Sequence, residues 1–204
     1  MKNIGWCLDN IQIVLSRLPK NINSKENKDK AIEIIDEVEK YTKTLEQLVE
    51  NPKLSDYLSK LDKAPVSGVR LESHEVEALL KDLGHIVYTL NLYIPELRVM
   101  IKKHSTTWWY KGKQTIIALT DLLNKNKKKL GKEYTLWQNI KSKIRMRLNQ
   151  FNNKADRITH EIDERFGGGR GDLRAEFYIL LHKEKELKEL ITDVEHLEKL
   201  INLK

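Results

Sequence analysis

The 204-residue sequence is poor in residues that cross-link or interrupt a chain. It has one cysteine, four prolines and nine glycines. A single cysteine, Cys7, excludes an intramolecular disulfide and a multi-cysteine zinc site, and we interpret it as a small buried hydrophobe. This cysteine usage is typical of a reducing compartment, so we expect a cytoplasmic location. So few prolines and glycines exclude a linker or a low-complexity chain.

Long apolar runs and strand-like alternation are also scarce. The most apolar window, residues 85–101, is too short for a membrane span and contains Asn91, Glu96 and Arg98. Residues 1–20 carry no signal-peptide pattern, because polar residues interrupt their apolar part and no small-residue cleavage site follows. We therefore expect no membrane span, and the lack of alternating segments predicts an all-α protein.

What the sequence does contain is helical periodicity. One stripe advances in steps of four and three without error: Val76, Leu80, Leu83, Val87, Leu90, Ile94, Leu97 and Ile101. Because this register crosses Pro95 unbroken, we predict one helix over residues 73–103, kinked near the proline. Further helices are predicted over residues 4–18, after the N-caps Ser24 and Asn51, and over residues 114–130, ending at Gly131.

The C-terminal third is predicted to be a long antiparallel helical hairpin. Residues 133–166 and 172–203 carry apolar stripes of more than three heptads, which is coiled-coil-like. The glycine-rich residues 167–171 lie between them, followed by Asp172 as an N-cap. They are not a phosphate-binding loop, because neither Lys-Ser nor Lys-Thr follows Gly171 and no strand precedes them. A short flexible turn between two long helices predicts a reversal of the chain.

The expected architecture is thus an elongated multi-helix bundle. We divide the sequence into an N-terminal helical bundle, residues 1–131, and the hairpin, residues 132–204, packed together as one domain. The heptad stripes could also dock on a protein partner or on a second copy of the chain, which would make the protein a scaffold or a subunit of an assembly.

Positive charge is concentrated in one segment. The formal net charge is +7, but residues 102–157 contain fifteen Lys or Arg against three acids, so the rest of the chain is net acidic. On a helical projection, four of these cations fall beside the apolar stripe and would form a ridge: Lys143, Arg147, Lys154 and Arg157. Such a ridge is suited to neutralising phosphates, so we expect contact with nucleic acid.

Other residues of this segment could extend the contact. A non-specific clamp would consist of Lys125, Lys127, Lys128 and Lys129. Trp108 and Trp109, next to Lys111 and Lys113, could stack on unpaired bases or fill one end of the core. Lysines with interfacial aromatic residues also suit an anionic membrane surface, so DNA, RNA and anionic lipid stay open.

The sequence offers little sign of metal or cofactor chemistry. Asp82 with His85, and Asp193 with His196, have the i, i+3 spacing of metal-binding helices. Di-iron bundles use Glu-x-x-His motifs with further inward-facing glutamates, and these companions are not evident. We therefore expect no metal site, no cofactor and no catalytic residue in the preferred interpretation, a non-enzymatic binding protein.

One spacing favours an enzymatic alternative. Arg98 and His104 are separated by five residues, which resembles the Arg-x(4–6)-His motif of the HEPN-domain ribonucleases, a family of all-helical bundles. The resemblance covers two residues, and it implies that Arg98 and His104 act on the scissile phosphate of RNA. The family usually has a polar residue after the arginine, where this sequence has Val99.

Overall fold

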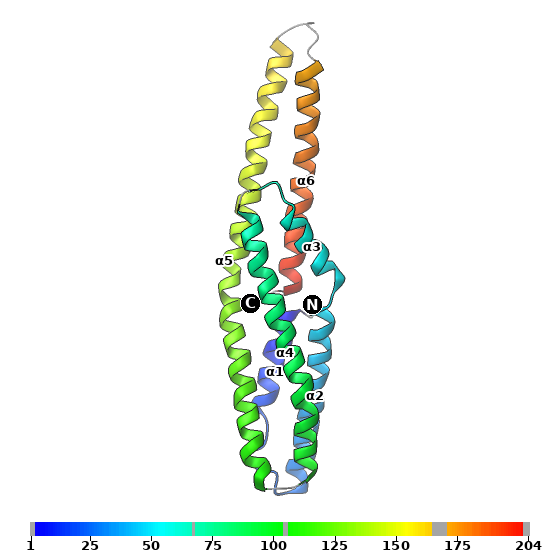
Figure 1. Ribbon diagram of the computed structural model, residues 1–204, viewed down its shortest axis with the longest axis vertical. Coiled ribbons are helices and arrows are strands. Elements are labelled where there is room, and N and C mark those ends of the chain that lie inside the picture. Colours follow the sequence, from blue (N-terminus) through cyan, green and yellow to red (C-terminus); the bar gives the residue numbers. More distant parts are fainter. Residues whose placement is uncertain (1–2, 67, 104–105, 165–170, 202–204) are drawn as a thin grey trace.

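The computed structural model describes residues 3–66, 68–103, 106–164 and 171–201, and in these ranges the chain forms helices and no strand. Within the helices, side chains are not described at 106–111, 113, 127, 129–135, 162–164 and 171–174. The predicted all-α, multi-helix fold is confirmed (Figure 1). The helices are α1 (Ile4–Ser16), α2 (Lys25–Val49), α3 (Pro52–Asp62), α4 (Val69–Lys103), α5 (Thr106–Glu164) and α6 (Gly171–Ile201).

The helices form an elongated bundle (Figure 1). Their contacts arrange them in four columns. Two columns are the single long helices α4 and α5, which pack against each other. The third consists of α2 followed by α3, both packed on α4. The fourth is shared by α1 and α6, which meet near the middle of the molecule and both pack on α5. Each half of the bundle therefore contains parts of α4 and α5 together with two other helices. These are α1 and α2 in one half, and α3 and α6 in the other.

The predicted N-caps of α2 and α3 are confirmed. The hydroxyl of Ser24 accepts a hydrogen bond from the backbone N–H of Asn27 at 3.1 Å. The side chain of Asn51 accepts one from the N–H of Lys53 at 3.0 Å, and Pro52 occupies the first turn. In both cases a side-chain oxygen satisfies a backbone donor that has no partner within the helix.

The long helix α4 passes through Pro95 as one helix, as its unbroken stripe predicted. It begins at Val69 rather than at Ser73, and Ser73 is fully buried inside it. Seven of the eight predicted stripe residues are buried, and Leu80 is half-buried. The helix is therefore fixed by its apolar face, which compensates for the backbone hydrogen bond that an internal proline removes. The kink near Pro95 stays a prediction.

The predicted connector before residue 114 and the predicted helix end at Gly131 are wrong. Residues 106–164 form one helix of 59 residues, about 90 Å long at ~1.5 Å per residue. A glycine inside a helix costs about 1 kcal/mol relative to alanine, which packing on both sides outweighs. Buried positions continue in the same register before and after Gly131: Leu119, Leu123 and Asn126, then Trp137, Ile140 and Ile144. The boundary drawn between residues 131 and 132 thus falls inside α5.

The long C-terminal hairpin is formed by α5 packing against α6. The predicted turn at residues 167–171 lies outside the described residues except for Gly171, which begins α6. Asp172 is therefore within the first helical turn rather than at the predicted N-cap position. The end of the hairpin extends beyond α3 and α4 (Figure 1).

We call this two-helix extension, residues 147–164 and 171–185, the arm, and the four-column remainder the body. Two places where other segments come close to α5 and α6 mark the boundary between the arm and the body. A Cβ on Gly68, just before α4, would lie 2.9 Å from Nζ of Lys143, and Pro65, just after α3, lines a pocket with Leu187. Cys7 is fully buried in the body, as expected.

Candidate nucleic-acid interface

Two members of the predicted basic ridge lie at the contacts between helices. Lys143 forms an ion pair with Glu72 of α4, whose side chain is mostly buried. Lys154 forms an ion pair with Glu176 of α6 in the arm. Both cations are partly neutralised within the chain, so each would have to exchange a carboxylate for a phosphate in order to bind nucleic acid.

The other two members are exposed. The guanidinium of Arg147 lies 4.7 Å from the centre of the Phe151 ring and donates a hydrogen bond to the Gln150 side chain at 2.9 Å. These contacts hold Arg147 against the groove between α5 and α6, which it lines. Arg157 is exposed near the far end of the arm. The structure thus separates a ridge that looks uniform on a helical projection into paired and open positions.

A different set of residues forms the exposed side of α5. We define the outer face of α5 as the exposed cations and amides Lys125, Lys128, Asn139, Arg145, Asn149, Asn153 and Arg157. Between Asp121 and Asp156 the sequence has one acid, Glu133, whose spacing places it in the register of the core stripe. Among the described residues from 122 to 155, α5 therefore presents cations, amides, Ser142 and the 60% exposed Met146 to solvent, and no carboxylate.

The remaining predicted contact residues lie in α5, but their side chains are outside the described set. They are Trp108, Trp109, Lys111, Lys113, Lys127 and Lys129. Their backbone is helical, so the two tryptophans belong to the first turns of α5 and not to the connecting loop that the sequence suggested.

Sequence reasoning missed the role of Lys141. This lysine is buried, and its Nζ lies 2.6 Å from Oε2 of Glu198 on α6. A helical projection places Lys141 at the edge of the apolar stripe, and this position was the one sign in the sequence that the lysine is buried. The projection does not reveal its partner Glu198, which is 57 residues away along the chain. Lys141 therefore joins α5 to α6 and is not available to a phosphate.

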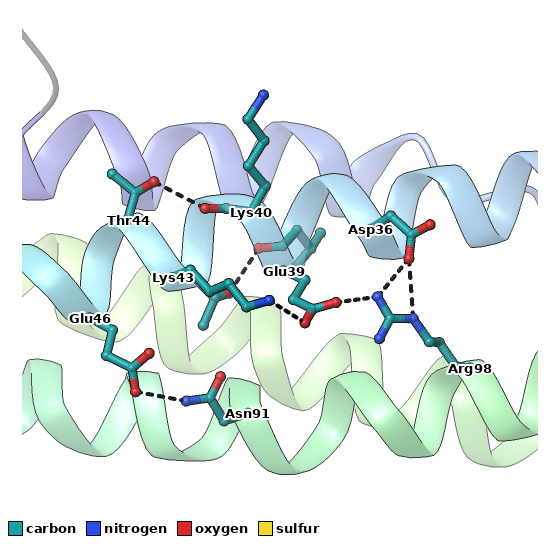
Figure 2. A network of polar contacts seen from close by, with 10 residues as sticks. Asp36, Glu39, Lys40, Lys43, Thr44, Glu46, Asn91 and Arg98 are labelled. Carbon is teal, nitrogen blue, oxygen red and sulfur yellow. Dashed lines mark hydrogen bonds and ion pairs between the residues drawn. The ribbon is translucent and has the colours of Figure 1, made fainter.

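Arg98, the residue of the nuclease alternative, takes part in a polar network between α4 and α2 (Figure 2). Its guanidinium donates to Oδ1 of Asp36 at 2.6 and 3.1 Å and also to Glu39. Lys43 approaches Glu39 at 2.9 Å, and the side chain of Asn91 donates to Glu46 at 3.2 Å. The network therefore links α2 and α4 by ion pairs and hydrogen bonds along their exposed edge.

The network shifts the pKa values of Glu39 and Arg98. The hydrogen bond from Arg98, followed by that from Lys43, holds the pKa of Glu39 below its ordinary value of 4.5. The bonds to Glu39 and then Asp36 raise the pKa of Arg98. Arg98 is thus a permanently charged clamp held by two carboxylates of α2. His104, its predicted catalytic companion, lies outside the described residues.

No protein-family model, curated protein or solved structure matches this chain. A proposal about function must therefore rest on the fold and the surface of this chain. Over the described residues, no helix has the length and apolarity to cross a membrane. The same residues contain no group of three or more His, Cys, Asp or Glu that could hold a metal ion.

Proposed function

We propose that the protein is a non-enzymatic helical binding protein that contacts nucleic acid through the outer face of α5. The observation that carries the proposal is the exposed row of cations and amides on one long helix, without a described carboxylate from residue 122 to residue 155. Lysine and arginine neutralise phosphates and release counterions, while amides donate hydrogen bonds to phosphate and sugar oxygens. A cytoplasmic location belongs to the same proposal.

The outer face suits a backbone contact rather than sequence recognition. Lys128 and Arg145 are 17 residues apart on one helix, which corresponds to about 25 Å. A rigid rod with widely spaced cations can follow a phosphate backbone, but it brings no described side-chain cluster to a base edge. Binding should therefore be sensitive to salt and tolerant of sequence.

The test is fluorescence anisotropy with labelled single-stranded RNA and duplex DNA of about 30 nucleotides, from ~50 to ~300 mM salt. We expect the logarithm of the association constant to fall linearly with the logarithm of salt concentration. A variant with Lys125, Lys128, Arg145 and Arg157 all changed to Gln should bind at least about tenfold more weakly. On duplex DNA its salt slope should be shallower by up to about 3.6 if all four residues contact phosphates.

A matched control removes the same charge from helices other than α5. Lys40, Lys53, Lys63 and Lys81 are exposed residues of α2, of α3 with its C-cap, and of α4. Changing these four to Gln should alter affinity by less than about threefold. Equal losses in both variants, or no binding by the wild type at ~50 mM salt, would contradict the proposal.

The same preparation separates the alternatives. Binding to vesicles with anionic lipid, but not to RNA or DNA, would assign the outer face to a membrane surface and overturn the proposal. Cleavage of the RNA that His104→Ala abolishes would instead favour the HEPN-like nuclease.

A further inference from the structure

The arm contains an apolar run that its surroundings do not cover. Residues 177–181 are Phe-Tyr-Ile-Leu-Leu, five consecutive apolar positions that together face every side of α6. Leu180 is buried against α5, but Tyr178 is 69% exposed and Ile179 is 55% exposed. A helix that is apolar all round is normally buried all round, and in the arm α6 has only α5 beside it (Figure 1). The run therefore indicates a second surface that packs on the arm.

A groove between α5 and α6 passes through this run. Its apolar lining consists of the buried Phe151 and Leu180 and the exposed Ile179. Its polar lining consists of Arg147, Gln150, Lys154, Glu176 and Lys183. The groove thus combines an apolar surface with three cations and one acid, and its occupant should carry apolar side chains flanked by acids.

The arm itself carries the complementary charge at its other end. In α5, residues 147–154 at the base of the arm include two cations and no acid. Beyond Lys154, the described charged side chains of α5 are two acids, Asp156 and Glu161, and one cation, Arg157. Two arms placed side by side in opposite directions would bring the acidic end of each next to the basic base of the other.

We propose that a second copy of the chain docks in this groove, arm against arm and antiparallel, about a two-fold axis close to Lys154 and Ile179. A closed two-fold contact uses the same patch on both copies, as this self-complementary arm requires. Arg147 lies seven residues from Lys154 toward the base, and Glu161 lies seven residues from it toward the far end. The axis therefore sets Arg147 of each copy opposite Glu161 of the other.

The pairing also restores the cross-section of the body. Two arms contribute four helices, and the body likewise has four helix columns around its core. The exposed apolar residues of the run would then have neighbours on both sides. Three residues of the outer face, Asn149, Asn153 and Arg157, lie within the arm, so dimerisation is tested on protein that is free of nucleic acid.

The first experiment measures the mass of the nucleic-acid-free protein by sedimentation equilibrium from ~1 to ~100 µM. We expect a species of twice the 24.0 kDa chain mass. Ile179→Glu should weaken dimerisation at least about tenfold, because it removes the apolar contact at the axis and requires a carboxylate of each copy to lose its water there. Ile117→Glu is the matched control, since Ile117 is 49% exposed on α5 but lies outside the arm, and it should leave the dimer unchanged.

The second experiment tests the register by charge reversal. Arg147→Glu and Glu161→Arg should each weaken the dimer about tenfold, and the double variant should recover to within about threefold of the wild type. A monomer at every concentration, or a dimer that Ile179→Glu does not weaken, would overturn the proposal. A double variant weaker than either single variant would overturn the antiparallel register. Circular dichroism confirms that each variant remains folded.

Discussion

The body and the arm are made from the same kind of sequence, but they bury it to different degrees. In the body many core residues are fully buried, such as Leu83 and Ile140, although some, such as Val87, keep 6% of their surface. In the described part of the arm no core residue is fully buried: Phe151, Ile158 and Leu180 keep 5 to 8% of their surface. The difference arises because helices of the body have several neighbours and those of the arm have one. A heptad stripe thus fixes which side of a helix is apolar, while the number of neighbouring helices determines how completely it is covered.

The largest effect should come from removing core volume in the body. Leu90→Ala should lower the free energy of unfolding by about 3–4 kcal/mol, because a fully enclosed site retains the cavity. Leu180→Ala in the arm should cost about 2 kcal/mol, because the site borders solvent and can relax. Urea unfolding at low protein concentration, followed by circular dichroism, measures both. Equal losses would mean that the arm is enclosed as tightly as the body.

An intermediate effect should come from the buried ion pair. Lys141→Ala leaves the Glu198 carboxylate without its partner, and should cost about 2–3 kcal/mol because Glu198 retains some solvent contact. Lys154→Ala breaks the corresponding pair of the arm, which is much more exposed, and should cost less than about 1 kcal/mol. The double variant Lys141→Met with Glu198→Leu should recover most of the first loss. A cost for Lys154→Ala as large as for Lys141→Ala would contradict the comparison.

The smallest effect on stability is expected for the polar network between α2 and α4 in the body. Arg98→Met should cost about 1 kcal/mol at pH 7, because the network is partly exposed. The lowered pKa of Glu39 means that its stabilisation is complete above pH ~4.5 and is lost as the pH falls through the lowered value. The difference between wild type and variant should therefore shrink from pH 5 toward pH 3 in urea titrations. A difference that stays constant over this range would show that Glu39 is not the group concerned.

The fold could be predicted from the sequence wherever an unbroken stripe was recognised. The stripe of α4 predicted a helix through Pro95, and the same criterion should have joined the two parts of α5 across Gly131. The prediction instead ended a helix at Gly131, and the polar residues Asn126 and Glu133 interrupt the apolar stripe on either side of that glycine. Asn126 is nevertheless buried, with its amide donating to the backbone carbonyl of Leu122 at 2.8 Å.

The candidate site was only partly predictable for a related reason. A helical projection gives the direction of a side chain but not what lies there. It placed Lys143 beside the apolar stripe, yet its partner Glu72 is 71 residues away and comes near only when α4 packs on α5. The same holds for Lys141 and Glu198. The overall excess of cations in residues 102–157 was evident, whereas the division into paired and exposed cations required the structure.

The column shared by α1 and α6 also implies an order of assembly during translation. One half of the bundle, built from α1, α2, the end of α4 and the start of α5, has all its helices once the first part of α5 has left the ribosome. The other half lacks its fourth helix until α6 is made. Until then α3, whose Lys60 bonds Asp193 of α6 at 3.0 Å, has no partner on that side. The last 31-residue helix thus determines when the second half can fold, and a nascent chain halted before it would expose unpaired apolar surface to chaperones.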